Sequence, residues 1–113
     1  MAPTFVGGGG GRDRLSIVVM TDLELRHLRA VCAIADAGSI TKAASTLGVT
    51  QPGLSAQLRA VEEIIGGSLF NRDSAGCTPT EIGTDLIAMA RPLLNDLVEM
   101  TDHARQLAGA STT

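Results

Sequence analysis

The stretch "SITKAASTLGVTQPGLSAQLRAVEE", residues 39–63, decides the fold of this chain. Ser39 is a suitable N-cap, and apolar residues follow it with the three-and-four spacing of one helical face. Gly48 predicts the end of that short helix, and Thr50 offers the cap of the next. The two apolar stripes are Ile40, Ala43, Ala44 and Leu47, then Leu54, Leu58, Val61 and Ile65. Two short amphipathic helices joined by a tight glycine turn are typical of a helix-turn-helix.

The second of these helices opens with two poor helix formers, Pro52 and Gly53. Proline is tolerated in a first turn because the amide hydrogen it lacks would have no partner there. A small helix start of this kind can expose amides to a phosphate. Gln51, Ser55 and Gln57 add neutral groups of the sort that read base edges in a major groove. An ordinary helix start with a polar solvent face is the alternative, but the preceding helix and turn favour DNA recognition.

A further helix is predicted upstream, in "TDLELRHLRAVCAIADAG". Thr21 followed by Glu24 forms a capping-box pattern, although Asp22 is an alternative cap. Gly38 predicts the end of the helix. Cys32 is interpreted as a small core residue, since free cysteines are commonly buried. The expected apolar face is Leu25, Leu28, Val31, Cys32 and Ala35.

After Gly66 and Gly67 the helical period gives way to residues 68–72 and 77–79, separated by the turn-like "DSAG". We expect these two segments to pair as a hairpin that forms a small wing.

The last predicted element is a long helix, capped by Thr80 and running to about Ala108. Pro92 lies inside it and is expected to kink it. Its apolar stripe is too long to be buried on so small a domain, which predicts a homodimer through this helix. The expected dimer contacts on this stripe are Leu86, Met89, Leu93, Leu97, Met100 and Leu107. Ile82 and Ala104 belong to the same stripe.

Composition narrows the class of protein. A chain of 113 residues supports one small domain with a modest core. Phe5 and Phe70 are its two aromatic residues, which disfavours base-stacking platforms for single-stranded nucleic acid. The net charge is −3, yet Lys42 and Arg59 are the only charged residues within positions 37–61. A polyanion is therefore expected to meet the middle of the chain.

Other function classes are disfavoured. Cys32 and Cys77 form no disulfide framework and no Cys/His grouping has metal-ligand spacing, so we expect no cofactor and a reducing, cytoplasmic location. The apolar run at residues 15–20 is too short for a signal-peptide core or a membrane span, so no membrane contact is expected. His27 and His103 have no nucleophile at triad-like positions, and we predict that the chain is not an enzyme.

These patterns divide the chain into four parts. Residues 1–19, with a run of five glycines, are predicted to be a flexible tail, and Met20 is an alternative start. Residues 20–79 are the predicted winged helix-turn-helix domain, 80–109 the linker and dimerisation helix, and 110–113 a short tail. The expected fold class is mainly α: three helices plus a β-hairpin wing, then the long helix.

The sequence resembles the N-terminal DNA-binding domain of LysR-type transcriptional regulators. The motifs "GSITKAASTLGVTQPGLSAQL", "EE", "LFNR" and "TEIG" occur in order, and the similarity covers about residues 23–100. The resemblance implies a winged helix-turn-helix that binds double-stranded promoter DNA and dimerises through its linker helix. Family members usually carry a C-terminal effector domain. That domain is absent here, so we expect no small-molecule effector site in this chain.

The resemblance also implies where DNA is contacted. Arg72 has two interpretations, a contact at the base of the wing or a structural pairing with a nearby acid. The family often has arginine where this chain has Ala56, and a basic wing tip where it has residues 73–76. Each missing phosphate contact flattens the salt dependence by roughly 0.9 in log–log slope, which predicts weaker binding than in a typical relative. The expected DNA contacts are Lys42, Thr50, Gln51, Pro52, Gly53, Ser55, Ala56, Arg59 and Arg72.

Two alternatives remain open at this level. A truncated dimerisation module could antagonise a full-length regulator through mixed dimers. A winged-helix scaffold could also serve as a protein–protein adaptor, because fold does not dictate function.

Overall fold

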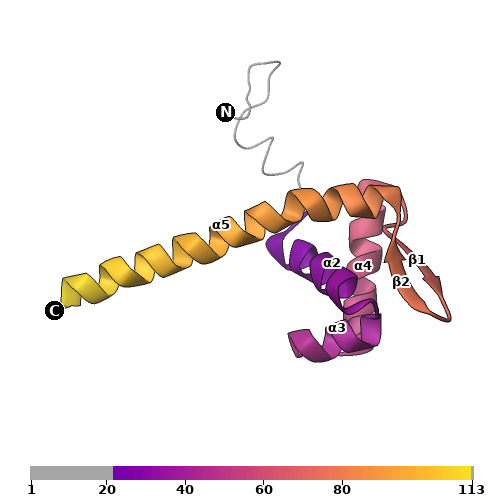
Figure 1. Ribbon diagram of the computed structural model, residues 1–113, viewed down its shortest axis with the longest axis horizontal. Coiled ribbons are helices and arrows are strands. Elements are labelled where there is room, and N and C mark those ends of the chain that lie inside the picture. The colour runs from indigo at the N-terminus through magenta and orange to yellow at the C-terminus, as the bar shows by residue number, and fades with distance from the viewer. Residues whose placement is uncertain (1–21, 113) are drawn as a thin grey trace, which may run out of the picture.

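The computed structural model of the protein describes residues 22–112. These residues form α2 (Leu25–Ala37), α3 (Ile40–Leu47), α4 (Gln51–Ile65), β1 (Phe70–Asp73), β2 (Gly76–Pro79) and α5 (Glu81–Thr112) (Figure 1). The two strands pair antiparallel, with Phe70 opposite Pro79 and Asp73 opposite Gly76. The expected mainly α winged helix-turn-helix with a long final helix is confirmed. The predicted tail at residues 1–19 lies outside the described residues.

Aliphatic side chains from the four helices meet in a common core with Leu69 and with Phe70 of the first strand. Each fully buried Leu, Ile or Val side chain contributes on the order of 1.5–3 kcal/mol relative to an exposed one. Cys32 belongs to this core, which confirms its interpretation as a small core residue. Its burial raises the pKa of the thiol. The largest fully buried side chains of the core are Val31, Ile34, Leu54, Leu58, Val61 and Leu69.

Glycines end α2 and α3 as predicted. Gly38 and Gly48 both have a φ of 70°, a left-handed conformation that glycine adopts without strain. The Val49 N–H donates to the Ala44 carbonyl at 3.0 Å, which closes the turn between α3 and α4. Ser39 caps α3 through its hydroxyl oxygen, also as predicted. The short helix and tight turn therefore follow from residues visible in the sequence.

A hydrogen-bonded junction ties the end of α4 to the wing and to α5. Glu62 Oε2 accepts from the Leu69 N–H at 2.9 Å. Thr80 donates from its hydroxyl to the Ser68 carbonyl at 2.7 Å, and its backbone N–H donates to the Leu69 carbonyl at 3.0 Å. The Thr80 hydroxyl also accepts from the Gly83 N–H at 3.1 Å, so the predicted cap of the long helix is confirmed. A Cβ at Gly83 would collide with the Leu69 carbonyl oxygen, which explains the glycine.

The start of α2 differs from the predicted one. The helix begins at Leu25 with Glu24 as N-cap, and the Glu24 N–H donates to Nδ1 of buried His27 at 3.0 Å. Histidine thus takes the part that glutamate or glutamine plays in the usual capping box. Asp22 therefore does not cap the helix, and Thr21 lies outside the described residues. Leu25 itself is 40% exposed because it occupies the first helical position, at the edge of the core.

Other boundaries also move. Ile65, predicted on the buried stripe of its helix, is 39% exposed because it is the last helical residue before Gly66. The wing strands are Phe70–Asp73 and Gly76–Pro79 rather than residues 68–72 and 77–79, so the connecting turn is shorter than predicted.

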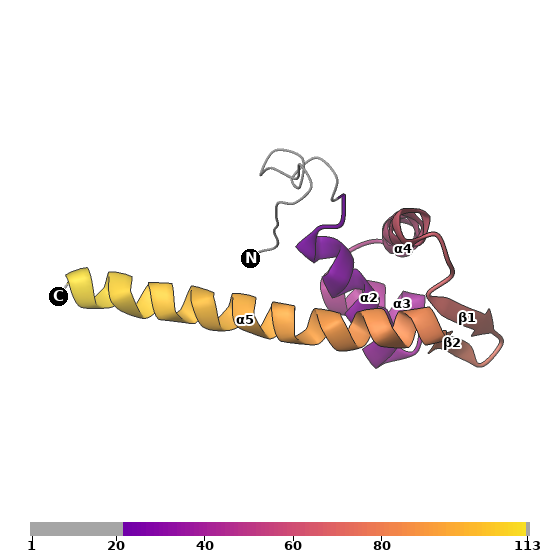
Figure 2. The same ribbon diagram turned by 90° about the horizontal axis from the view of Figure 1, so that it is seen from above.

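The long helix packs on the domain near its N-terminus and then projects away from it (Figures 1 and 2). Its buried contacts are Ile87 and Ala90, with Leu86 and Leu94 half-buried beside them. Ile87 and Ala90 lie outside the stripe predicted from the sequence. At 3.6 residues per turn, their face is rotated by about 100° from that stripe. The predicted stripe is therefore mostly exposed, with Leu86 and Leu97 half-buried, and the prediction missed the face that α5 buries.

The expected kink at Pro92 does not occur. α5 runs through Pro92 as one helix, and Figure 2 shows it nearly straight. Pro92 and Ala88 are both exposed, so water can satisfy the Ala88 carbonyl that loses its partner. The helix continues to Thr112 instead of ending near Ala108, which corrects the predicted tail at residues 110–113. No helix of residues 22–112 has the length and apolarity needed to cross a membrane.

Candidate nucleic-acid interface

The start of α4 is small and exposed, as predicted, but its backbone is less open than expected. The Thr50 hydroxyl oxygen accepts from the Gly53 N–H at 3.1 Å. A Cβ at Gly53 would lie 2.9 Å from that oxygen, so the glycine leaves room for the cap. Because Pro52 lacks an amide hydrogen and the Gly53 amide is engaged, Gln51 supplies the amide that remains in this turn. Side chains must therefore carry most of the binding capacity here.

A row of polar side chains follows on one side of α4. The Gln51 amide donates from Nε2 to Ser55 Oγ at 3.4 Å. Arg59 lies four residues beyond Ser55, and this spacing keeps all three on neighbouring turns of one face. Ala56 is exposed next to them, with no side-chain bulk beyond its methyl group. The row offers an amide, a hydroxyl and a guanidinium to an approaching surface.

Two further basic residues flank α4. Lys42 is exposed on α3, and Arg72 is exposed on β1 opposite Cys77. Within residues 22–112 neither forms an ion pair, so the structural pairing considered for Arg72 is not what the structure contains. At the wing tip, Asp73 Oδ1 accepts from the Ala75 N–H at 2.8 Å, which gives this acid a role in shaping the turn.

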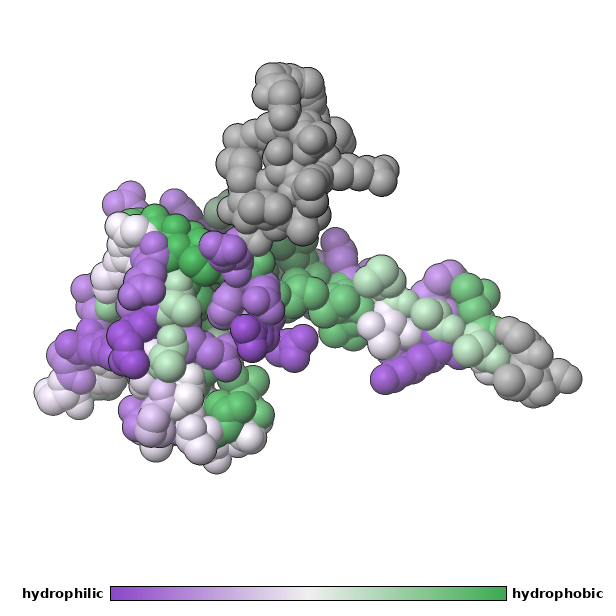
Figure 3. Space-filling model, turned by 180° about the vertical axis from the view of Figure 1, so that it is seen from behind, coloured by the Kyte–Doolittle hydropathy of each residue, from purple (hydrophilic) through white to green (hydrophobic). Residues whose placement is uncertain are grey.

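The expected DNA contacts lie on the surface of the protein, outside its core. Hydrophilic residues gather over the compact body of the molecule, whereas hydrophobic residues recur along the projecting helix (Figure 3). Ser55 is half-buried, and the other expected contacts are exposed: Lys42, Thr50, Gln51, Pro52, Gly53, Ala56, Arg59 and Arg72.

Sequence reasoning missed two arginines that the fold brings to α4. Arg26 and Arg29 of α2 line a cavity of about 120 Å³ together with Leu47, Val49 and Gln57. The i, i+3 spacing in "LRHLR" puts both arginines on one side of their helix, which is a visible signal. This side of α2 faces α4 because of the tertiary packing, which the local sequence pattern does not indicate.

The exposed face of α5 is strongly apolar. Met89 is 64% exposed, Leu93 53% and Met100 63%, whereas Leu86 and Leu97 are half-buried. Leu86 is packed against the core of its own domain, so part of its surface is already used. Leu107, also expected at the dimer contact, lies exposed near the end of the helix.

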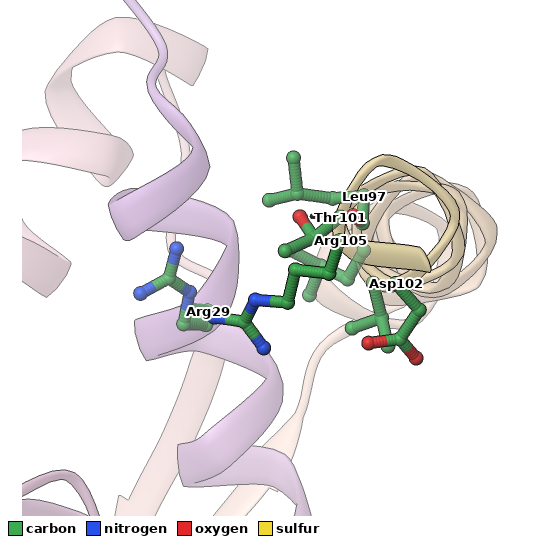
Figure 4. A pocket seen from close by; sticks show the side chains of 7 residues that line it. Arg29, Leu97, Thr101, Asp102 and Arg105 are labelled. Atoms are coloured by element: carbon green, nitrogen blue, oxygen red, sulfur yellow. Dashed lines mark hydrogen bonds between the residues drawn. The ribbon is translucent and has the colours of Figure 1, made fainter. Parts of the chain in front are cut away.

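An ion pair joins α5 to α2, and the two helices also form a groove. Arg91 donates from an Nη atom to Asp36 Oδ1 at 2.8 Å. Further along, a cavity of about 340 Å³ lies between the helices, and Figure 4 shows Arg105 reaching across from α5 toward α2. The Arg29 side chain extends away from α5 in the same view. The groove is thus separate from the cavity beside α4, although Arg29 lines both.

Comparison with known proteins adds a family match. Residues 25–84 match the family described as bacterial regulatory helix-turn-helix protein, lysR family. The small neutral protease regulatory protein of Streptomyces coelicolor is 53% identical over 87 residues, covering 77% of this chain and 26% of that protein. The transcriptional regulator AbaB of Streptomyces antibioticus is 41% identical over 80 residues, covering 71% and 27%. The chain thus spans about a quarter of the length of these relatives.

Solved structures give the same match. The BenM DNA-binding domain in complex with catB site 1 DNA superposes with a TM-score of 0.72 at 36% identity, covering 76% of this chain and 97% of that one. The CbnR DNA-binding domain in complex with DNA has a TM-score of 0.69 at 32% identity, covering 76% and 99%.

Proposed function

The chain belongs to the LysR family of bacterial helix-turn-helix regulators, and we propose that it binds double-stranded promoter DNA in a sequence-specific manner. The observation that carries the proposal is the exposed first turn of α4, set off from α3 by the turn at Gly48. Similarity to domains solved in complex with DNA supports it.

Each expected contact has a role that follows from its chemistry. Gln51 and Ser55 offer the donors and acceptors that read base edges in a major groove. Lys42 and Arg59 offer charge to the phosphates on either side of that groove. Arg72, unpaired within the described residues, offers the same from the wing. Thr50 fixes the first turn through its cap, and the small residues Pro52, Gly53 and Ala56 let that turn approach the bases closely.

We further propose a homodimer through α5. The exposed apolar face around Met89, Leu93 and Met100 would lose contact with water when two such helices pair. A symmetric dimer presents two α4 helices, so the selected DNA should be palindromic, with half-sites about one helical turn apart or a multiple of it.

The proposed role is binding rather than catalysis, and its natural location is the cytoplasm, where bacterial DNA lies. His27 supports this, because it is buried and its Nδ1 accepts a backbone hydrogen bond at the start of α2.

A second candidate function is that of a dimerisation partner for a longer regulator. The exposed apolar face of α5 favours it, since that face can pair whether or not α4 touches DNA. A chain with this function would form mixed dimers without selecting a DNA sequence. A protein–protein adaptor role makes the same prediction about DNA.

Selection of duplexes from a random pool tests the proposal. The wild-type protein should enrich a palindromic sequence. Gln51→Ala combined with Ser55→Ala should then weaken binding to it, since a good base contact provides about 1–3 kcal/mol of discrimination. Gln106→Ala, an exposed glutamine on α5, is the matched control and should leave the affinity unchanged. Failure to enrich any sequence would favour the dimerisation or adaptor functions instead.

A further inference from the structure

One residue that lines the cavity beside α4, Gln57, carries a buried oxygen that has no hydrogen-bond partner among the described residues. Gln57 Oε1 is inaccessible to solvent and accepts no hydrogen bond from residues 22–112. A buried acceptor left without a donor is unfavourable, so the structure as it stands has an unused hydrogen-bonding site at this position. The cavity, about 120 Å³, is also lined by two strong donors, Arg26 and Arg29.

Neither arginine is firmly held by the protein. Arg29 forms no ion pair within residues 22–112, and its side chain extends away from α5 (Figure 4). Arg26 pairs with Glu24, Nε to Oε1 at 3.2 Å, but the two side chains are 65% and 58% exposed. An exposed ion pair of this kind is weak and readily exchanged for another anion. Two guanidinium groups at i and i+3 also repel each other unless an anion lies between them.

The position of the cavity indicates which anion. Val49, one of its lining residues, directly precedes the cap of α4, and Gln57 lies on α4 itself. The cavity therefore borders the same helix whose first turn is proposed to enter the major groove. The groove is walled by phosphodiesters on both sides, and planar guanidinium groups match phosphate oxygens in pairs.

We propose that Arg26 and Arg29 bind a backbone phosphate of the DNA beside α4, and that Gln57 positions the Arg29 guanidinium by accepting one of its N–H groups. This inference rests on the proposed DNA binding and assigns residues of α2 to the same interface. It adds two basic contacts that the family resemblance did not include. These would partly replace the basic residues that the family often has at the positions of Ala56 and the wing tip, whose only charged residue here is Asp73.

The salt dependence of DNA affinity tests the arginines. It is measured on a duplex selected by the wild-type protein and on an unrelated duplex, because phosphate contacts do not depend on sequence. Arg26→Gln and Arg29→Gln should each reduce the log–log slope by roughly 0.9 on both duplexes. Each variant should then show a change in Kd between about 50 and about 200 mM salt that is about 3.5-fold smaller. Arg29→Lys, which keeps the charge, should retain the wild-type slope.

Arg105→Gln is the matched control, since it removes the same charge from an exposed position on α5 and should leave the slope unchanged. Wild-type slopes for both Arg26→Gln and Arg29→Gln would overturn the inference and leave the proposed DNA binding intact. Absence of DNA binding by the wild-type protein would overturn both.

Gln57→Met tests the positioning role. It removes the unpartnered oxygen at nearly constant volume, so the thermal unfolding midpoint should not fall. DNA affinity should fall on both duplexes, because Arg29 loses the acceptor that orients it. A lowered midpoint with unchanged DNA affinity would assign Gln57 to packing alone and overturn its positioning role.

Discussion

The compact body and the projecting helix both carry apolar residues at three-and-four spacing, but the body buries them and the helix leaves many of them exposed. In α2, α3 and α4 an apolar residue every three or four positions turns inward, and side chains such as Leu54 and Leu58 are fully buried. In α5 the same spacing leaves Met89, Leu93 and Met100 more than half exposed. The difference lies in what surrounds each helix, since α5 is much longer than the body against which it packs (Figure 1).

This contrast separates two sources of stability. The body is held by its own core and by the junction at Glu62 and Thr80, both within one chain. The exposed face of α5 contributes to stability when something covers it. Substitutions in the body should therefore change the free energy of unfolding, and substitutions on that face should change assembly.

The largest expected effect is in the core of the body. Leu58→Ala should lower the free energy of unfolding by about 2–5 kcal/mol, because it removes buried methyl groups and leaves a cavity. Leu93→Ala, the same substitution on the exposed face, should change the stability of the monomer by about 0.5 kcal/mol or less. Denaturant unfolding of both variants at low protein concentration measures the difference, and equal losses would contradict the contrast.

The junction should be the next most sensitive. Glu62→Ala removes the acceptor of the Leu69 N–H and should cost about 1–3 kcal/mol. Glu63→Ala is the neighbouring control: its side chain is exposed, and we expect a change of about 0.5 kcal/mol or less. Thermal unfolding of the pair shows whether position 62, rather than the loss of one acid, matters. A similar loss at both positions would refute the role of the hydrogen bond.

On the projecting helix, charge should act on assembly. Leu93→Asp and Met100→Asp should each weaken self-association by about tenfold or more, or about 1.4 kcal/mol, because a carboxylate would be buried between helices. Asn95→Asp adds the same charge on another side of α5 and serves as the control. Sedimentation equilibrium gives the dissociation constants. If Leu93→Asp and Met100→Asp both leave the dissociation constant unchanged, the dimer contact does not involve this face of α5.

The smallest effect concerns the cap of α4. Thr50→Ala should cost about 1 kcal/mol, because the Gly53 amide loses its acceptor. Thr41→Ala, at an exposed position of α3, is the control and should be close to neutral. Thermal midpoints of the two variants decide the matter, and a neutral Thr50→Ala would mean that the cap contributes nothing measurable.

Local signals in the sequence predicted most of the body. Gly38 and Gly48 end helices because a left-handed residue is needed there, and Ser39, Thr50 and Thr80 cap helices because their hydroxyls accept amide hydrogens. These effects act within a few residues, so a linear pattern contains them. The use of His27 in place of an acidic or amide side chain at the start of α2 falls outside the usual pattern and was missed.

Features set by tertiary packing were harder to predict. α5 carries apolar residues on two faces, and the sequence alone did not indicate that Ile87 and Ala90 would face the core. For the same reason the sequence placed no residue of α2 at the candidate interface, although Arg26 and Arg29 lie beside Gln57. The expected DNA contacts on α3, α4 and the wing are accessible, and their contact with DNA stays a prediction.

Backbone amide chemical shifts, recorded while a selected duplex is added to the protein, test the central claim most directly. If the first turn of α4 enters the major groove, the largest shifts should fall on the amides of residues 50–56 other than Pro52, with smaller ones at Lys42 and Arg72. The projecting half of α5 should change little at a fixed oligomeric state. Large shifts confined to residues 94–107, with none at 50–56, would contradict the claim.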